Sequence, residues 1–261
     1  MAFGYLKRSG DNFLLRSKLG EVLLDKSSHE FLGGQFSYLT LRSLEYGKMD
    51  ELFHTGKASS ATGSFEAIDA ATEWDHEAFL RLIKRNRQIG TLLERGCKFL
   101  DVGCGSGGLL QKLVRMYPKT QFTGIDPSEK AIELARKRLG GTASLYPLSG
   151  CDMAFSEEFD LIYCGEVLYS VSEKDKFLSR CREALSPGGS IVIVEGLIPA
   201  RPRNPAGPED LLIFGMQLDF ALQGARFLRT DEISGLLSRA AFGSIRLTNL
   251  GGRLYLITAR K

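Results

Sequence analysis

The feature that most constrains the fold is a glycine-rich turn directly after a short apolar run, in FLDVGCGSGGLL at residues 99–110. KFLDV (98–102) reads as a buried strand, and GLLQKLVRMY (108–117) has helical spacing of apolar residues and stops before Pro118. Glycines permit a tight turn and let a ligand lie close to the backbone. The free N–H groups at the start of the following helix favour anionic or polar ligands. The segment therefore predicts a nucleotide-type binding loop in an α/β fold.

Strand-like and helix-like segments alternate after this loop. The predicted strands are 121–126, 143–147, 159–164 and 190–196, and the predicted helices are 127–140, 172–185, 211–223 and 230–243. A proline-rich loop at 197–210 interrupts them, and a strand pair joined by Gly251 and Gly252 closes the chain. Such alternation predicts a parallel sheet with helices on both faces.

Residues 1–92 differ in character from the rest. They hold all three histidines and the single tryptophan, and the spacing of apolar residues over 79–93 reads as helix. We therefore predict two parts, a mainly helical region over 1–92 and an α/β domain over 93–261.

Composition excludes several classes of partner. The net charge of +3 and the lack of a block rich in lysine and arginine give no footprint for nucleic acid. No apolar run reaches the roughly 20 residues that span a bilayer, so no membrane partner is expected. The five cysteines form no C-x-x-C pair, which argues against a metal site or a disulfide framework and favours a cytoplasmic location.

Two acids decide between nucleotide ligands. The run Gly103–Gly108 satisfies G-x-G-x-x-G, the dinucleotide fingerprint, which by itself would suggest an NAD-dependent oxidoreductase. Asp101 precedes that run by two residues and would repel a diphosphate, whereas it would attract an amine or a sulfonium. Asp126 ends the second strand, where a carboxylate accepts hydrogen bonds from ribose hydroxyls. The pair favours a positively charged ligand that contains adenosine.

Four ordered motifs carry a family resemblance. LDVGCGSGGLL, TGIDPSEKAIELA, FDLIYCGEVLYSV and REALSPGGSIVIVE resemble the class I S-adenosylmethionine-dependent methyltransferases over about residues 95–196. The resemblance implies a Rossmann-like, mostly parallel seven-stranded sheet, and S-adenosylmethionine as cofactor.

The resemblance also implies cofactor-binding roles for individual residues. Asp101, Gly103, Cys104 and Gly105 would line the methionine part, Asp126 would bind the ribose, and Pro127 would shape the loop beside the adenine. Cys151, Asp152 and Met153 would bind the cofactor, with Asp152 meeting the adenine amine, and Cys164 would border the sulfonium with Gly165. The alternatives are a capping role for Asp152 and simple core packing for Cys164.

The flanking segments SHEFLGGQFSYL (28–39) and FHTGKAS (53–59) resemble small-molecule O-methyltransferases that carry an N-terminal dimerisation domain. The core is also similar to that of quinone and polyketide tailoring methyltransferases. These likenesses imply a small aromatic or polyketide-like acceptor, and a helical cap over residues 1–92 that could form a homodimer.

One departure from that subgroup concerns the catalytic base. The subgroup has V-L-H-D-W after the fourth strand, with histidine as the base, whereas this chain has V-L-Y-S-V with Tyr169 in its place. A tyrosine with a pKa near 10 is a poor base at neutral pH. The base is then Glu166 or a histidine of the N-terminal region (His29, His54 or His76). Alternatively, the acceptor is an amine or an acidic phenol that needs no base, or it is a nucleophilic carbon. Tyr38, Tyr46 and Trp74 are candidates for an aromatic lid.

Two rival functions stay open at this point. One is the NAD-dependent oxidoreductase, and the other is a non-catalytic protein that binds S-adenosylmethionine. Methyltransferases of adenine or glutamine carry Asn/Asp-Pro-Pro-aromatic after the fourth strand, where this chain has residues 163–166, YCGE. DNA, RNA and protein glutamine are therefore not the expected acceptors.

Overall fold

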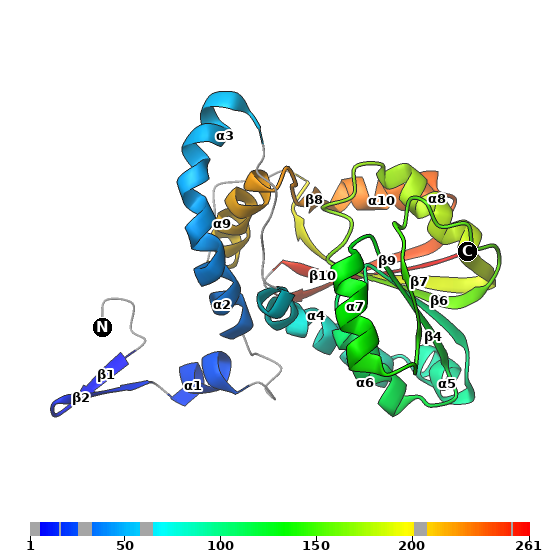
Figure 1. The fold of residues 1–261 in the computed structure, drawn as a ribbon, viewed down its shortest axis with the longest axis horizontal. Helices are drawn as coiled ribbons and strands as arrows, with labels where there is room; N and C mark the ends of the chain where they lie inside the picture. The colour runs from blue at the N-terminus through cyan, green and yellow to red at the C-terminus, as the bar shows by residue number, and fades with distance from the viewer. Residues whose placement is uncertain (1–5, 16, 26–32, 58–64, 201–207, 252) are drawn as a thin grey trace.

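The computed structural model describes residues 6–15, 17–25, 33–57, 65–200, 208–251 and 253–261 (Figure 1). The elements before the glycine loop are β1 (Leu6–Ser9), β2 (Asn12–Leu15), α1 (Ser17–Leu24), α2 (Gly33–Arg42), the 3-10 helix η1 (Ser43–Lys48), α3 (Met49–Thr55), α4 (Phe65–Arg85), α5 (Arg87–Arg95) and β3 (Lys98–Val102). Those after it are α6 (Gly108–Met116), β4 (Gln121–Asp126), α7 (Glu129–Leu139), β5 (Ser144–Pro147), β6 (Phe159–Gly165), α8 (Lys174–Ala184), β7 (Leu185–Ile198), α9 (Pro208–Leu222), β8 (Leu228–Arg229), α10 (Thr230–Arg239), β9 (Gly243–Gly251) and β10 (Leu254–Arg260).

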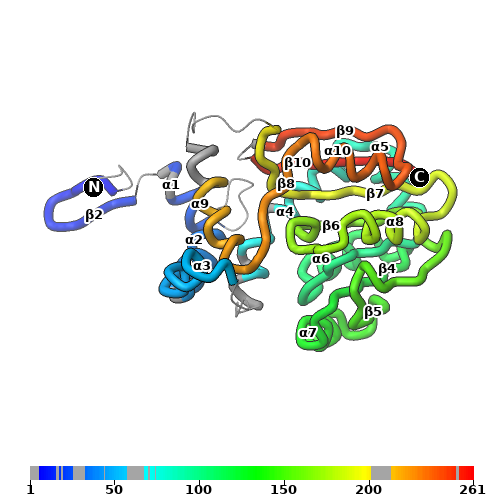
Figure 2. Tube along the Cα trace, turned by 90° about the horizontal axis from the view of Figure 1, so that it is seen from above, coloured from blue at the N-terminus to red at the C-terminus, as the bar shows by residue number. Residues whose placement is uncertain are grey.

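The main sheet follows the order β5-β4-β3-β6-β7-β10-β9, and the two-residue strand β8 pairs beside β7. β5, β4, β3, β6 and β7 are parallel neighbours, whereas β10 runs antiparallel to both β7 and β9. Figure 2 shows the sheet from edge to edge, with β9 and β5 on opposite sides. The predicted mostly parallel, seven-stranded α/β fold is thereby confirmed.

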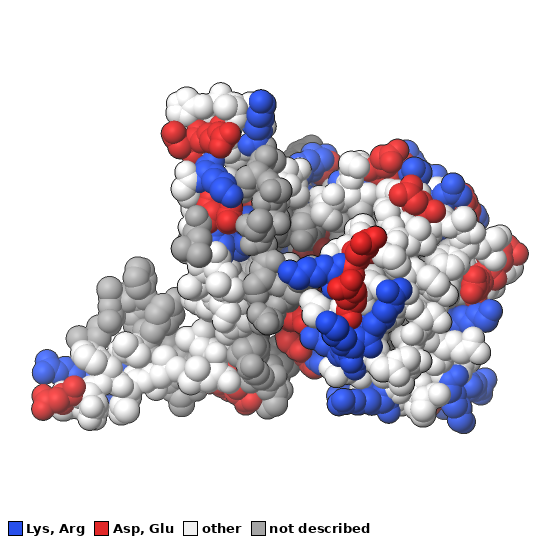
Figure 3. Space-filling view, in the orientation of Figure 1, with Lys and Arg blue, Asp and Glu red and all other residues white. Residues whose placement is uncertain are grey.

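Helix α7 begins and ends where its sequence signals predict. The Ser128 hydroxyl accepts a hydrogen bond from the Ala131 N–H at 3.2 Å, which is an N-cap, and Gly140 ends the helix with a φ of 56°. Glu129 lies in its first turn, and Arg136, Lys137 and Arg138 lie in its last turns, which suits the helix dipole. Figure 3 shows this mixture of acidic and basic side chains over α7.

The helix predicted over residues 79–93 is wrong in one respect, because two helices meet there. Asn86 has an extended backbone, and its side chain accepts hydrogen bonds from the N–H groups of Gln88 at 3.1 Å and Ile89 at 3.2 Å. Asparagine favours such a cap over a helix interior, so α4 ends at Arg85 and α5 begins at Arg87. The hairpin of β1 and β2, which projects from the rest in Figure 1, was not predicted either.

The core has two layers, one on each face of the sheet. Helices α4, α5 and α6 cover one face and bury Phe99 and Tyr163, whereas α8 and α10 cover the other and bury Leu100 and Cys164. Successive strand residues point to opposite faces, so neighbours such as Tyr163 and Cys164 belong to different layers. This alternation decides below which predicted residues reach the site.

Helix α4 connects the N-terminal region to the sheet. The ring of Phe79 packs on Tyr163 with centroids 4.5 Å apart, and both belong to the same buried cluster as Phe99. Farther from the sheet, α2 is tied to α9, because the Arg42 guanidinium donates to the Asp219 carboxylate at 2.8 Å. Figure 1 shows α2, α3 and α9 grouped beside the sheet. The division of the chain at residue 93 stays a prediction.

No helix within the described ranges is long and apolar enough to cross a bilayer. The five cysteines are all free thiols, and four of them are buried.

Candidate active site

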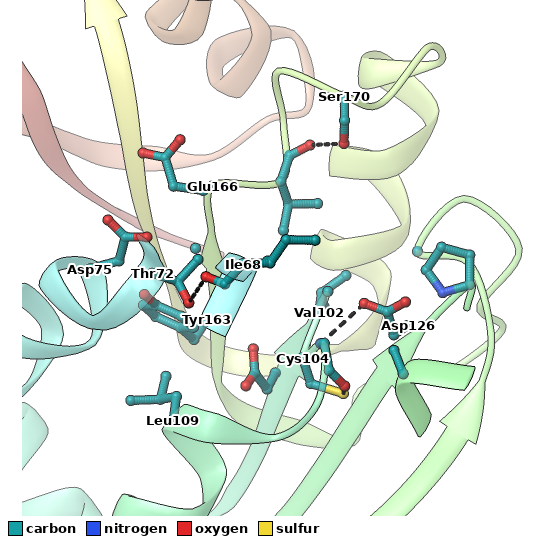
Figure 4. Close-up of a pocket in the computed structure, with 18 of the residues that line it drawn as sticks. Ile68, Thr72, Asp75, Val102, Cys104, Leu109, Asp126, Tyr163, Glu166 and Ser170 are labelled. Atoms are coloured by element: carbon teal, nitrogen blue, oxygen red, sulfur yellow. Dashed lines mark hydrogen bonds between the residues drawn. The ribbon is translucent and has the colours of Figure 1, made fainter. Parts of the chain in front are cut away.

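A cavity of about 490 Å³ opens at the carboxyl ends of β3, β4 and β6, between the glycine loop and α4. Ligands of open α/β sheets bind at this edge. Five carboxyl groups line the cavity, and its described lining contains no lysine or arginine; the acids are Asp69, Asp75, Asp101, Asp126 and Glu166. Figure 4 shows Asp126 at one end of the cavity and Asp75 with Glu166 at the other.

The glycine loop is fixed to the neighbouring strand. The N–H groups of Gly103 and Cys104 both donate to the Ile125 carbonyl, at 2.8 and 3.0 Å. Gly103 has a φ of 81°, and a Cβ there would lie 2.4 Å from the Val167 side chain. This position therefore requires glycine, because the loop passes directly against the segment after β6.

Asp126 ends β4 and shapes the start of the cavity. Its carboxylate accepts hydrogen bonds from the N–H groups of Gly105 at 3.1 Å and Ser128 at 2.9 Å. Burial raises the pKa of Asp126, and these two N–H donors oppose that rise. The carboxylate is thus held in one orientation at the cavity wall, with its remaining lone pairs available to a ligand's hydroxyl groups.

Asp101 lies deeper, at the end of β3. It is 3% exposed, and burial, together with the nearby charge of Asp126, raises its pKa to about 8. A buried carboxyl with no cation beside it favours its neutral form. A ligand that brings an ammonium or sulfonium group to this place would restore the carboxylate and be attracted by it.

The structure brings most of the predicted site residues to the lining of one cavity. Those that line the cavity are Asp101, Gly103, Cys104, Gly105, Asp126, Pro127, Cys151, Glu166 and Tyr169.

Asp152, Met153 and Cys164 do not line the cavity. The Asp152 carboxylate is 66% exposed and lies 3.6 Å from the Lys176 ammonium. Met153 and Cys164 are buried in the layer under α8 and α10, because the strand alternation turns Cys164 away from the cavity face. In this arrangement Cys164 acts as a small core residue, which was the alternative to its predicted place beside the sulfonium.

Two glutamates fix the loop after β6. The buried Glu195 of β7 accepts hydrogen bonds from the N–H groups of Val167, Leu168 and Tyr169, the last at 2.8 Å. Glu166 has a φ of 51°, in the left-handed region, and its carboxylate accepts from the Gly196 N–H at 2.8 Å. Burial raises the pKa of Glu195 to about 7 and that of Glu166 well above its usual value.

Tyr169, the residue in the expected place of the histidine, stacks on Phe220 of α9. The ring centroids are 4.3 Å apart and the planes differ by 10°. Burial raises the pKa of Tyr169 well above 10, so its phenol keeps its proton. The side chain can pack against a ligand or donate a hydrogen bond, but this environment makes it a still poorer base.

The N-terminal histidines differ in their positions. His54 is exposed and pairs with Asp50, and His29 lies outside the described residues. His76 lines the cavity beside Gly108, and burial lowers its pKa to about 4. Of the aromatic lid candidates, Tyr38 donates to Asp219 at 2.9 Å, and neither it nor Tyr46 lines the cavity.

The sequence reasoning missed Asp75 and Tyr163, which both line the cavity. Asp75 is 1% exposed, and neither its two carboxylate oxygens nor the Tyr163 hydroxyl has a hydrogen-bond partner. A signal was present in the helical spacing. Asp75 stands three residues before Ala78 and four before Phe79, so it occupies a core-facing position of α4.

Comparison with known proteins agrees with this geometry. Residues 100–191 match the family model described as "Methyltransferase domain". A ubiquinone biosynthesis O-methyltransferase of Bradyrhizobium sp. is 32% identical over 120 residues, which cover 45% of this chain and 46% of that protein. A trans-aconitate 2-methyltransferase of Acidovorax ebreus is 31% identical over 176 residues, which cover 65% of this chain and 66% of that protein. The chain belongs to the class I S-adenosylmethionine-dependent methyltransferases.

A solved methyltransferase shares the fold along the whole chain. The human N-acetylserotonin methyltransferase in complex with S-adenosylmethionine aligns with a TM-score of 0.71 at 18% identity, covering 100% of this chain and 80% of that one. This likeness concerns the class I methyltransferase fold. The two curated relatives are matched over about half and about two thirds of their lengths.

Proposed function

We propose that this class I methyltransferase transfers the methyl group of S-adenosylmethionine to a small aromatic or polyketide-like molecule. The observation that carries the proposal is the cavity at the glycine loop, whose charged groups are carboxyls without a lysine or arginine in the described lining. S-adenosylmethionine carries a sulfonium and an ammonium group, so it suits such a wall. Asp101 would bind its ammonium group and Asp126 its ribose hydroxyls.

The oxidoreductase alternative fits this cavity poorly. A dinucleotide brings a diphosphate, which binding sites hold with helix N-termini and cationic side chains. Here the diphosphate would have to approach the Asp126 carboxylate, with no cation from the described lining residues to offset it. Electrostatic repulsion therefore favours the sulfonium cofactor.

The lack of a lysine or arginine in the described lining also narrows the chemical class of the acceptor. A relative is named for trans-aconitate, a tricarboxylate, and another for ubiquinone biosynthesis. Three carboxylates brought beside Asp75 and Glu166 would find no lysine or arginine in the described lining to pair with, so we favour a neutral, quinone-related ring over an acidic acceptor. The rate would come chiefly from orientation of the acceptor against the methyl group and from exclusion of water.

Residues 1–92 would act as a helical cap in this proposal. Ile68, Thr72 and Asp75 of α4 line the cavity, which supports a role of this region in closing it. A homodimer formed through the cap and a cytoplasmic location complete the proposal.

The test is calorimetric titration of the full chain with S-adenosylhomocysteine and, separately, with NADH. We expect binding of the first and none of the second. Binding of NADH alone would overturn the proposal. A separate assay offers the protein labelled S-adenosylmethionine and a panel of naphthols. Transfer of the labelled methyl group to a naphthol distinguishes an enzyme from a protein that only binds the cofactor.

A further inference from the structure

At the end of the cavity farthest from Asp126, a hydrogen-bond acceptor and a donor are both left without partners. Asp75, from α4, has two buried carboxylate oxygens that accept no hydrogen bond, and Tyr163, from β6, has a buried hydroxyl that makes none. Figure 4 shows both beside Thr72 at this end of the cavity. Buried polar groups are almost always paired in folded proteins, so the unpartnered groups in this cavity wall, which also include Nδ1 of His76, point to a ligand that completes them.

The other carboxyl groups near this end of the cavity already accept hydrogen bonds from backbone N–H groups. Glu195 is held by three backbone N–H groups and Glu166 by the Gly196 N–H. Each of these glutamates therefore serves the loop after β6, whereas Asp75 serves no structural hydrogen bond. Thr72, its neighbour in the lining, donates to the Ile68 carbonyl at 3.1 Å within the helix.

Tyr163 is fixed in place and close to Asp75. Its ring packs on Phe79, one helical turn beyond Asp75, with centroids 4.5 Å apart. After burial, the charge of Asp75 is the main cause of the raised pKa of Tyr163, so the phenol keeps its proton and can donate. A Cβ at Gly165 would lie 2.5 Å from the Tyr163 hydroxyl, so glycine leaves space for that group.

We propose, on the basis of the function above, that Asp75 is the proton acceptor of the reaction and that the methylated atom is the oxygen of an aromatic or enolic hydroxyl group. A hydroxyl complements both residues, because it donates to the Asp75 carboxylate and accepts from the Tyr163 phenol. An aromatic amine donates well but accepts poorly, and a carboxylate cannot donate to Asp75.

The step balances with these groups alone. A lone pair of the acceptor oxygen forms a bond to the methyl carbon as the bond from that carbon to sulfur breaks, and the sulfur keeps the electron pair. The hydroxyl proton passes to the ionised carboxylate of Asp75. Because burial and the charges of Glu166 and Glu195 raise the pKa of Asp75, this carboxylate forms after its own proton has passed to water. The products are the methyl ether, S-adenosylhomocysteine and a protonated Asp75, which then returns its proton to water. Asp75 thus takes the part of the histidine that Tyr169 replaces.

The experiment uses the full chain and three naphthalene probes: 2-naphthol, 2-naphthylamine and 2-naphthoate. Each is titrated into the protein loaded with S-adenosylhomocysteine, and each is offered with labelled S-adenosylmethionine. We expect 2-naphthol to bind at least tenfold more tightly than 2-naphthoate and to be methylated on oxygen. Tighter binding of 2-naphthoate, methylation of the amine in preference to the hydroxyl, or binding of none of the three overturns the proposal.

Variants of Asp75 and Tyr163 test the role of each residue in the reaction. Asp75→Asn removes the base without changing the size of the side chain, and we expect about 100-fold or greater loss of kcat with 2-naphthol. Tyr163→Phe removes only the donor, so we expect a rise in the KM for 2-naphthol of about fivefold. Asp75→Glu should restore part of the lost rate. Asp75→Asn and Tyr163→Phe should both keep the affinity for S-adenosylhomocysteine within twofold of that of the native chain, which would show that the fold and the cofactor site are intact.

The matched control is Glu77→Gln, which changes a carboxylate of the same helix that pairs with Lys112 at the surface. It should keep the native rate. Unchanged turnover in Asp75→Asn, or an equal loss in Glu77→Gln, overturns the role of Asp75. Loss of turnover in His76→Asn with Asp75→Asn still active would assign the base to His76 and also overturn it. Failure of the native chain to bind S-adenosylhomocysteine would instead overturn the proposed function.

Discussion

The Arg138 guanidinium of α7 donates a hydrogen bond to the Asp69 carboxylate of α4 over 2.6 Å and another to the Ser106 hydroxyl of the glycine loop over 2.8 Å. Ser106 in turn donates to Asp69. Three elements far apart in sequence therefore meet at one side chain, at the place where α4 lies over the cavity.

Arg138→Met should release α4 from the glycine loop and so increase the dissociation rate of S-adenosylhomocysteine by about three- to tenfold. The groups are about 30% exposed, so the loss of folding stability should stay below about 1 kcal/mol. Stopped-flow displacement measures the rate. Lys137→Met, an exposed neighbour on the same helix, is the control, and equal rates in the two variants would refute the proposed contact.

Asp126→Ala should weaken binding of S-adenosylhomocysteine about 30-fold, which corresponds to about 2 kcal/mol, because hydrogen bonds to a charged carboxylate contribute about 1.5–3 kcal/mol. Asp152→Ala should change the affinity by less than threefold, since that side chain is exposed and does not line the cavity. Calorimetry on both variants compares them directly. A larger effect at Asp152 would restore its predicted contact with the adenine.

The affinity for S-adenosylhomocysteine should rise as the pH rises from 6 to 8. In the empty site Asp101 keeps its proton up to a pH of about 8, and an ammonium group binds only the carboxylate. Binding below pH 8 therefore releases a proton, and the affinity rises by at most tenfold per pH unit. Above pH 8 Asp101 is already ionised in the empty site, so the gain stops.

Calorimetry in two buffers of different ionisation enthalpy measures the released proton. Asp101→Asn should abolish the rise with pH, and a rise that persists in this variant would assign it to another group. The raised pKa has an opposite effect on the empty protein. Because the folded chain holds this proton more tightly than the unfolded chain, its contribution to stability is present below about pH 4 and is lost as the pH rises through 8.

Two glycines of the loop should respond differently to alanine. At Gly103 the new Cβ would meet Val167 at 2.4 Å, so Gly103→Ala should lower the free energy of unfolding by about 3 kcal/mol. Gly105 has a φ of 52° and open space around it, in the cavity wall, so Gly105→Ala should cost about 1 kcal/mol of stability but weaken cofactor binding more than tenfold. Denaturant unfolding and calorimetry separate the two effects, and similar stability losses would contradict this account.

The order of the strands and helices after residue 97, apart from β8, could be predicted from sequence, because these elements carry their own local signals. α7 has a serine cap and a terminal glycine, and β3 ends at the glycine loop. The break at Asn86 was missed because apolar spacing continues across it, and only the cap shows that the helix restarts. β8 has two residues, too few for any periodic pattern.

The residues of the candidate site also differ in whether the sequence predicts them. Asp101 and Asp126 follow predicted strands, so their meeting at one sheet edge follows from parallel pairing. Asp75 comes from a helix that precedes β3, and no motif surrounds it. Packing of Phe79 on Tyr163 and the contacts of Asp69 bring α4 to that edge, and such contacts between distant elements leave no local pattern in the sequence.

The hydrogen bonds between Glu195 and the loop after β6 affect which side chains this loop can carry. Its carboxylate binds only main-chain N–H groups of Val167, Leu168 and Tyr169, and none of their side chains. The loop path is thus indifferent to which side chain stands at position 169. A histidine and a tyrosine at position 169 would therefore occupy the same place in the cavity. One substitution can thus change the functional group at this place without changing the path of the loop backbone.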